Sequence, residues 1–118
     1  MTATPVDKTY IMLMVTDMQR ALRFYTEAFA VTVMMNSPYW SEFSVAGATI
    51  ALHAGGSGAE TQTGLGFEVL DLDAALDRAL EVGGRIISPT RERAEERIRV
   101  AEVADTEGNV ITVAQLLA

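Results

Sequence analysis

The hydrophobic and polar positions in the first half of the chain predict a strand, a helix and three more strands. Residues 9–15, TYIMLMV, are almost continuously apolar and rich in strand-forming side chains, which indicates a buried strand. Asp17 is a candidate helix N-cap, and residues 18–30 follow it with apolar side chains at helical spacing. Further strands are predicted over residues 31–35, 39–45 and 48–54, with a turn at Ala46-Gly47.

The second half of the chain repeats this order after a polar, glycine-rich segment at residues 55–63, which predicts a linker. Residues 65–69 predict a strand, and Asp71 is again a candidate N-cap. The next helix is marked by an apolar stripe at Ala74, Ala75, Leu76, Ala79, Leu80 and Val82, and it is expected to end at Gly83-Gly84. The remaining strands are predicted over residues 85–88, where Pro89 ends the strand, 97–103 and 110–115.

Matching residues in the two halves indicate an internal repeat. The first half contains Val15, Asp17, Ala21 and Leu22, which recur at one constant offset as Val69, Asp71, Ala75 and Leu76. The predicted hairpin at residues 47–50 likewise recurs at 108–111. Since 118 residues suit one domain, the sequence predicts a single α+β domain over residues 1–118. Its expected parts are module one at residues 8–54, the linker at 55–63 and module two at 64–118.

Alternation along the strands assigns side chains to the two faces of each predicted sheet. The helix of each module is expected to cover one face. Tyr10, Met12 and Met14 fall on the other face, and we expect the uncovered faces to curve together into a cleft that removes them from water. Met34 and Trp40 are further candidates for the cleft wall, because methionine and aromatic side chains adapt to flat ligands. Core packing remains the alternative for the methionines and for Trp40, the only tryptophan.

Composition and charge narrow the classes of function. Hydrophobic residues make up 49% of the chain and charged residues 21%, and no apolar run has the roughly 20 residues of a membrane span. The first residues lack the pattern of a signal peptide, so we expect a cytoplasmic protein with no membrane partner. The formal net charge of −7 argues against nucleic-acid binding. The same charge either serves solubility alone or attracts a cationic ligand.

Three segments carry a family resemblance. They are Val15-Thr16-Asp17-Met18 leading into Ala21-Leu22-Arg23-Phe24-Tyr25, then FEVLDLD at residues 67–73, and DTEGN at residues 105–109. In this order and spacing, they resemble the vicinal oxygen chelate superfamily, which includes glyoxalase I, extradiol dioxygenases, fosfomycin-resistance enzymes and bleomycin-resistance proteins. The resemblance covers nearly the whole chain. It implies two tandem βαβββ modules that form a U-shaped eight-stranded mixed sheet around a cleft, usually in a homodimer.

The resemblance also implies where a metal would be bound. Enzymes of this superfamily hold a divalent metal with side chains, typically His and Glu, on the first and fourth strands of each module. The matching positions in this chain are Tyr10, Ala51, Gly64 and Thr112. Alanine and glycine have no donor atom, and neutral hydroxyls hold transition metals poorly, so we expect no metal and no cofactor.

His53, the only histidine, lies at none of these positions. One hypothesis joins it with Glu68 and Glu102 in a metal site like that of non-haem iron oxygenases. A second places His53 at the cleft rim as a hydrogen-bonding residue, and a third places it in direct contact with a ligand. Glu68 also suits a solvated strand position. No base partner is identifiable for Tyr10, so no catalytic residue is assigned.

Together with the resemblance, the sequence predicts a metal-free small-molecule-binding protein that sequesters a cationic or aromatic antibiotic or metabolite. The candidate ligand-binding residues are Tyr10, Met12, Met14, Met34, Trp40, Ala51, His53, Gly64, Glu68, Glu102 and Thr112. Two different functions remain open, namely a divergent glyoxalase- or dioxygenase-like enzyme and an accessory protein of a natural-product pathway. The expected partners are a small-molecule ligand and a second copy of the chain.

Overall fold

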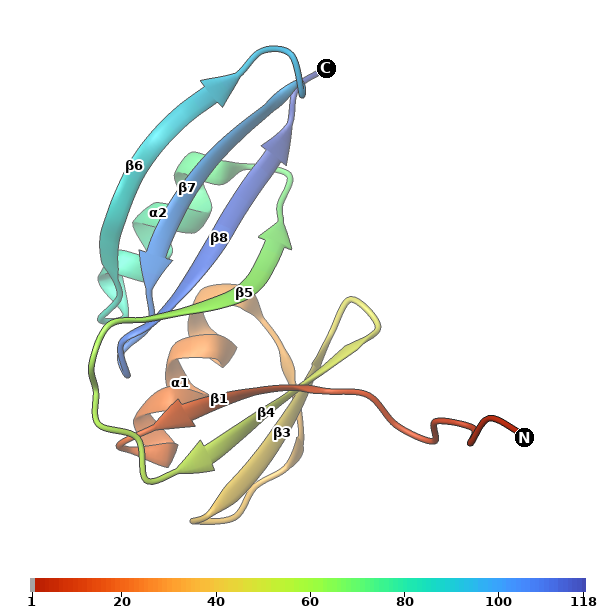
Figure 1. The fold of residues 1–118 in the computed structure, drawn as a ribbon. Coiled ribbons are helices and arrows are strands. Elements are labelled where there is room, and N and C mark those ends of the chain that lie inside the picture. The colour runs from red at the N-terminus through yellow and green to blue at the C-terminus, as the bar shows by residue number, and fades with distance from the viewer. Residues whose placement is uncertain (1) are drawn as a thin grey trace.

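The structure, a computed structural model, describes residues 2–118 and contains the order strand, helix, three strands twice (Figure 1). The first module comprises β1 (Ile11–Val15), α1 (Met18–Phe29), β2 (Thr32–Met35), β3 (Trp40–Val45) and β4 (Ala48–Ala54). The second comprises β5 (Thr61–Glu68), α2 (Leu72–Glu81), β6 (Arg85–Arg93), β7 (Ile98–Ala104) and β8 (Asn109–Leu116). The predicted α+β class with two tandem βαβββ modules is confirmed.

Each module forms its own four-stranded mixed sheet, in the order β1-β4-β3-β2 in the first module and β5-β8-β7-β6 in the second. The first strand of each module runs parallel to the fourth, and the other pairs are antiparallel. The registers of the two parallel pairs are equivalent. Met12 pairs with Ala51, and their counterparts in the repeat, Gly66 and Thr112, pair in the same way. The internal repeat therefore holds at the level of single residue pairs.

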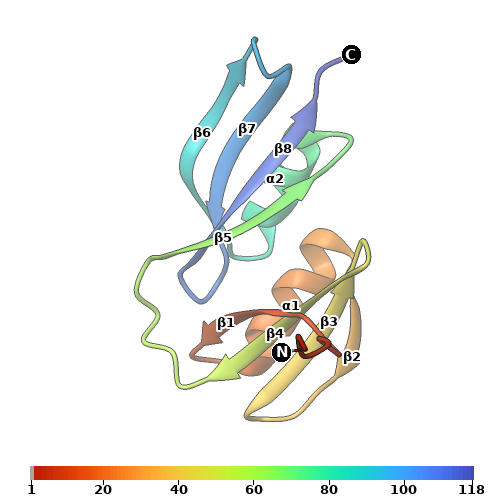
Figure 2. The same cartoon turned by 45° about the vertical axis from the view of Figure 1, so that its right-hand side comes forward.

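Both helices begin at the aspartates that the sequence predicts as N-caps. The Asp17 carboxylate accepts from the backbone N–H of Arg20, and the Asp71 carboxylate from that of Ala74, each at 3.1 Å. The helices lie on the same side of the two sheets and contact each other where the modules meet (Figure 1, Figure 2). Their buried faces share one core, whose largest fully buried side chains include Tyr25, Phe24, Phe43, Leu13, Ile50, Leu52 and Leu72. Within residues 2–118, no helix covers the opposite face of either sheet (Figure 1).

The second module begins earlier than predicted. Strand β5 starts at Thr61, inside the segment expected to be a linker up to residue 63, because Thr61 and Gln62 pair with Asn109 and Val110. A register shift follows, in which Gly64 has a φ of +75°, a conformation that suits glycine and strains other residues. The linker is therefore shorter than the composition suggested.

Two further predicted details in the second module are wrong. Strand β6 continues through Pro89 to Arg93 instead of ending at residue 88. Because β6 is an edge strand and its register shifts around the proline, the missing N–H is tolerated there. Leu80, assigned to the buried stripe of α2, is 46% exposed, and Leu72, Leu76 and Ala79 form the buried face instead.

The turn at residues 105–109, between β7 and β8, connects the second module to the first. The Glu107 side chain is fully buried and accepts hydrogen bonds from the backbone N–H groups of Thr16 and Asp17, each at 2.9 Å. The Arg20 guanidinium donates to both Glu107 oxygens, at 2.8 and 3.1 Å. Burial raises the pKa of Glu107, but the hydrogen bonds from Arg20, Thr106, Asp17 and Thr16 outweigh it and hold this pKa at about 2.

Asp105 extends this connection into the core. Its Oδ2 atom accepts from the buried Tyr25 hydroxyl at 2.6 Å, and its Oδ1 atom accepts from the backbone N–H groups of Glu107 and Asn109 at 2.8 and 2.9 Å. The Asn109 side-chain amide donates to the Met14 carbonyl of β1 at 2.9 Å. Burial raises the pKa of both Asp105 and Tyr25. The 105–109 turn thus fixes β1 beside the second module.

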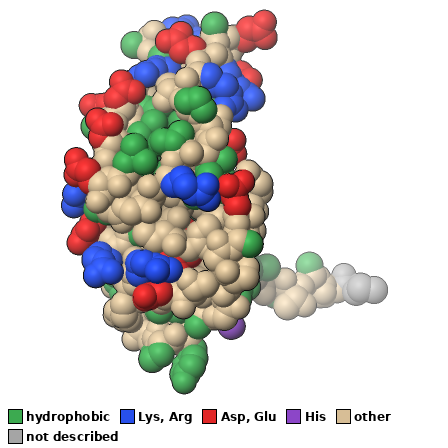
Figure 3. Space-filling view, turned by 90° about the vertical axis from the view of Figure 1, so that its left-hand side faces the viewer, with side chains coloured by type: hydrophobic (Ala, Val, Ile, Leu, Met, Phe, Trp, Pro, Cys, Tyr) green, Lys and Arg blue, Asp and Glu red, His purple; other side chains and the backbone are tan. Residues whose placement is uncertain are grey.

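The surface mixes charges of both signs. On the face shown in Figure 3, basic side chains lie among Asp and Glu side chains rather than in a single basic patch. Exposed ion pairs such as Arg78–Glu81, at 3.0 Å, contribute little to stability because water screens them. Within the described residues, neither helix has the length and hydropathy needed to cross a membrane.

Candidate functional site

The helix-free face of the first sheet carries a group of side chains, here called the Glu42 cluster, formed by Lys8, Tyr10, Trp40, Glu42 and His53. The Trp40 indole N–H donates to Glu42 Oε2 at 2.8 Å, and the Lys8 ammonium donates to Glu42 Oε1 at 2.6 Å. The rings of Tyr10 and His53 both meet the Trp40 ring edge to face, with centroids 5.4 and 5.9 Å from it. The cluster therefore places one carboxylate beside a cation and a row of three rings.

Alternation along β3 explains why Trp40 and Glu42 reach this face. Ser41 and Phe43 point to the opposite side of the sheet and are fully buried, Phe43 against the core. Strand β3 pairs with β4 so that Trp40 lies beside His53 and Glu42 beside Ala51. Strand β3 thus presents Trp40 and Glu42 on the helix-free face of the sheet, and Ser41 and Phe43 on the helix-covered face.

Glu42 is buried although it is a glutamate on a sheet face without a helix, with only 7% of its surface exposed. The hydrogen bonds from Lys8 and Trp40 lower the pKa of Glu42, and the Lys8 charge adds to this effect against the opposing influence of burial. Glu42 is therefore ionised at neutral pH, and Lys8 compensates its charge. Chemically, the arrangement can hold one positive charge next to aromatic surface.

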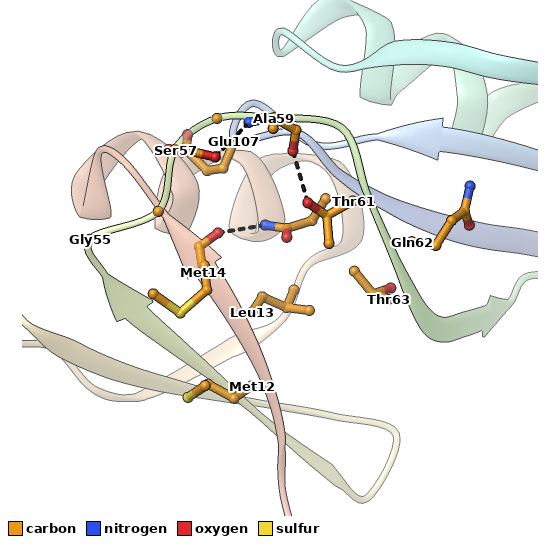
Figure 4. A pocket seen from close by; sticks show the side chains of 13 residues that line it. Met12, Leu13, Met14, Gly55, Ser57, Ala59, Thr61, Gln62, Thr63 and Glu107 are labelled. Atoms are coloured by element: carbon orange, nitrogen blue, oxygen red, sulfur yellow. Dashed lines mark hydrogen bonds between the residues drawn. The ribbon is translucent and has the colours of Figure 1, made fainter.

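A cavity of about 440 Å³ lies where the edge strands of the two sheets, β1 and β5, face each other. Met12 and Met14 line it from β1, and Thr61, Gln62 and Thr63 line it from β5 (Figure 4). The glycine-rich segment 55–59 and the 105–109 turn complete the lining. A cavity of this size and mixed polarity suits a small organic molecule, with thioethers on one wall and hydroxyl and amide groups on the other.

A second cavity, of about 380 Å³, lies at the other junction between the modules and is lined largely by apolar side chains such as Phe29 and Phe67. Ala46 also lines it. In the internal repeat, Gly47 is equivalent to Gly108, so Ala46 is equivalent to Glu107. The first module therefore has a methyl group where the second module has the Glu107 carboxylate. Alanine cannot make the hydrogen bonds of Glu107, so no equivalent contact closes this junction, and the cavity lies there.

The predicted ligand-binding residues are divided among these features. Tyr10, Trp40 and His53 belong to the Glu42 cluster, whereas Met12 and Met14 line the first cavity. Glu68 lines the second cavity. Neither of these two cavities contains all of the predicted residues, because the residues are spread over two separate sheets.

The other predicted residues lie outside both cavities. Ala51 is fully buried, and Glu102 pairs with Thr112 in the second sheet. Met34 is 67% exposed at a register shift, and it is Met35 that pairs with Glu42. The register shift between Val33 and Met35 is not visible in the sequence, and it places Met35 rather than Met34 opposite Glu42.

The four positions that the family uses for metal ligands do not fit a metal. Ala51 and Gly64 supply no donor atom, and the Tyr10 ring packs against Trp40. Thr112 leaves a single neutral hydroxyl, which is a poor ligand for transition metals. Neither family-like nor other metal chemistry can be assigned to this set of side chains.

The alternative metal site of His53, Glu68 and Glu102 is wrong. His53 lies in the first sheet, where its Nδ1 atom contacts the Ala54 carbonyl, and the two glutamates lie in the second sheet. Within residues 2–118, no three His, Cys, Asp or Glu side chains are arranged to hold a metal ion. His53 instead belongs to the row of rings in the Glu42 cluster.

Lys8 and Glu42 are the members of the cluster that were not predicted from the sequence. The internal repeat could have indicated Glu42. Glu42 pairs with Ala51 in the first sheet, and the predicted residue Glu102 pairs with the equivalent residue, Thr112, in the second. No pattern singles out Lys8, which precedes the first strand in a segment without helix or strand. Only the fold brings Lys8 across the sheet to a residue 34 positions later.

Comparison with known proteins identifies the family. Residues 9–113 match the model of the glyoxalase/bleomycin resistance protein/dioxygenase superfamily. A search of curated protein sequences finds no match. The family match therefore spans both modules and the linker between them.

Solved structures share the fold. A glyoxalase/bleomycin resistance protein/dioxygenase family enzyme from Burkholderia phytofirmans PsJN is 20% identical with a TM-score of 0.78, over 95% of this chain and 100% of that chain. The fosfomycin resistance protein FosX from Listeria monocytogenes, complexed with Mn(II) and sulfate, is 19% identical with a TM-score of 0.80, over 96% and 92% of the two chains. A glyoxalase-related enzyme from Fulvimarina pelagi is 18% identical with a TM-score of 0.77, over 92% and 87%.

At these identities the structural likeness shows a common fold and carries no activity over to this chain. The family match over residues 9–113 and the paired βαβββ modules agree with each other. The chain belongs to the glyoxalase/bleomycin resistance protein/dioxygenase superfamily.

Proposed function

We propose that this protein binds and sequesters a small organic molecule, an antibiotic or metabolite with an aromatic or cationic group, without metal chemistry. One observation carries the proposal. The metal-ligand positions of the family hold Tyr10, Ala51, Gly64 and Thr112, which supply no ligand set, while the first sheet presents the Glu42 cluster on its helix-free face. A face that keeps recognition groups but lacks metal ligands favours binding over metal-dependent catalysis.

Exposed apolar side chains would provide the binding energy. Tyr10, Met12, Met14 and Met35 are between 38% and 49% exposed on or beside the helix-free face. A ligand that covers them would remove apolar surface from water, and the thioethers can adjust to its shape. Trp40 adds an aromatic surface next to the Glu42 carboxylate.

We also propose that the working form is a homodimer in the cytoplasm. The radius of gyration is 15.1 Å. A compact domain of this length would have about 13–14 Å, and the N-terminal segment that extends from the body in Figure 1 contributes to the difference. The helix-free face of the first sheet exposes apolar side chains such as Met12 and Met14, so it is accessible to a second copy of the chain. Sedimentation equilibrium tests the homodimer, and a monomer mass at micromolar concentration would contradict it.

A thermal-shift screen of natural products tests the binding function. A ligand at 100 times its Kd adds about 2.7 kcal/mol of stability, which is readily detected. Compounds that stabilise the protein should also quench the fluorescence of Trp40, the only tryptophan. Trp40→Ala should weaken their binding by about 1–3 kcal/mol, whereas Tyr39→Ala, at an adjacent residue that is 77% exposed, should leave it unchanged. Equal affinity for the wild type and Trp40→Ala would contradict a site at this face.

Metal analysis separates sequestration from enzyme chemistry. Protein purified without a histidine tag should contain no stoichiometric Zn, Mn, Ni or Fe. A stoichiometric metal that is lost in His53→Ala would refute the metal-free proposal. That result would favour the alternative of a divergent glyoxalase- or dioxygenase-like enzyme.

A further inference from the structure

Three residue types that occur once in the chain meet in the Glu42 cluster. Lys8 is the only lysine, Trp40 the only tryptophan and His53 the only histidine. They come from the segment before β1, from β3 and from β4, and the first two bind the same carboxylate. The other eight cationic side chains of the chain are arginines, so its only side-chain ammonium group lies at Glu42.

The two partners of Glu42 are held in different ways. Trp40 belongs to β3, two residues from Glu42, and its ring is flanked by Tyr10 and His53. Lys8 belongs to an N-terminal segment without helix or strand, which extends away from the body of the protein in Figure 1. The Lys8 side chain is 52% exposed, whereas that of Glu42 is 9% exposed. Lys8 can therefore leave with little disruption, but the Glu42 carboxylate would then lack its counter-ion.

We propose that Lys8 is a built-in substitute for the cationic group of a ligand, and that an aromatic ammonium or amidinium displaces it to bind Glu42 beside Trp40. This inference rests on the proposed binding function and names the class of ligand. The ligand cation replaces the Lys8 charge, its N–H groups donate to Glu42 Oε1, and its ring contacts Trp40. The segment before β1 thus competes with the ligand, and selects against molecules that cannot replace its charge.

The charge of the protein and the shape of the site favour an aromatic cation as the ligand. The chain carries a net charge of −7, which attracts cations to its surface. A neutral ligand would have to displace the Lys8 ammonium and leave Glu42 unpaired, or else bind without reaching it. An aromatic cation pairs with the Glu42 carboxylate and also contacts the row of three rings. It should therefore bind more tightly than a neutral molecule of the same shape.

Benzamidinium and benzamide, a charged and a neutral probe of nearly the same shape, test the inference by NMR. The indole N–H of Trp40 gives the only signal of its kind and donates directly to Glu42, so its ¹⁵N–¹H resonance reports on the site. We expect benzamidinium to bind more tightly than benzamide. Lys8→Met keeps the aliphatic stem and removes the competing charge, so it should tighten benzamidinium binding about three- to fivefold. Glu42→Gln should abolish the preference for the charged probe, a loss of about tenfold.

The exposed ion pair Arg93–Glu96, at 3.3 Å in the second module, provides matched controls. Arg93→Met and Glu96→Gln change the net charge by the same amounts as the two test variants and should leave both affinities unchanged. The inference is overturned if Lys8→Met does not tighten benzamidinium binding, or if Glu42→Gln retains the preference. If both probes bind equally well, the inference fails while the binding function stands. If neither probe binds to the wild type or to Lys8→Met, the inference fails, and the thermal-shift screen decides separately on the binding function.

Discussion

Replacing Glu107 by glutamine should destabilise the protein at neutral pH, and the loss should shrink in acid. Glutamine keeps the shape of the side chain but removes the charge that faces Arg20 at 2.8 Å. Its amide N–H₂ group would also replace an oxygen that now accepts from Thr16, Asp17 or Arg20. Breaking a buried, charge-assisted network of this kind costs about 2–4 kcal/mol.

The pH dependence follows from the pKa of Glu107, which lies at about 2 in the folded chain against an ordinary value of 4.5. A pKa that is lowered on folding contributes stability that is fully present above about pH 5 and is lost as the pH falls towards 2. The difference between the two pKa values corresponds to about 3 kcal/mol, of which about 2 kcal/mol is lost between pH 6 and pH 3. Because Arg20 is 42% exposed and partly screened, we expect about 1–2 kcal/mol.

Urea denaturation followed by circular dichroism at 222 nm, at pH 6 and pH 3, measures this contribution without relying on Trp40, which contacts the titrating Glu42. Asp105 acts in the opposite direction, because burial raises its pKa and acid relieves its charge. Comparing the wild type with Glu107→Gln at each pH removes most of this common effect. Glu96→Gln, in an exposed pair, should show almost no loss at either pH. A stability difference for Glu107→Gln that is equal at pH 6 and pH 3 would refute the assignment.

Further predictions concern the same connection and the helix ends. Gly108→Ala should cost more than about 2 kcal/mol in urea denaturation, since Gly108 has a φ of +91° and its Cβ would lie 2.5 Å from the Gly58 carbonyl oxygen. Its repeat equivalent Gly47→Ala has a similar φ of +83° but open space around the Cβ, so it should cost only about 1 kcal/mol; equal losses would contradict the steric argument. Tyr25→Phe should lower stability by about 1–3 kcal/mol, because the buried Asp105 carboxylate loses a 2.6 Å hydrogen bond; an unchanged urea midpoint would argue against that bond. Asp17→Ala and Asp71→Ala should each cost about 1 kcal/mol in thermal unfolding as lost N-caps, and replacement by asparagine should restore most of it.

The order of elements was predictable because local patterns determine it. Asp17 and Asp71 precede apolar residues at helical spacing, and both are N-caps in the structure. Met12 and Gly66 are equivalent in the internal repeat of the sequence, and in the structure they pair with equivalent residues of the fourth strands. The prediction at Pro89 was wrong because the effect of a proline depends on whether its strand lies at the edge of a sheet, which the local sequence does not state.

The candidate site was predictable in part. Alternation placed Tyr10 on the helix-free face of the first sheet, where its ring contacts that of Trp40. The same rule could not detect the register shift that puts Met35 rather than Met34 beside Glu42. It also could not separate His53 from Glu68 and Glu102, which belong to a different sheet.

Local patterns and the internal repeat were enough to predict the two βαβββ modules and their helix caps, because these features depend on neighbours along the chain. The family resemblance then located the metal positions. Tertiary structure alone decided that Lys8 meets Glu42 from 34 residues away and that Glu107 reaches the start of α1 from 90 residues away. Such contacts depend on how two strands and two modules are packed, and packing is a property of the whole chain. The proposed binding chemistry therefore rests on a contact that no local pattern specifies.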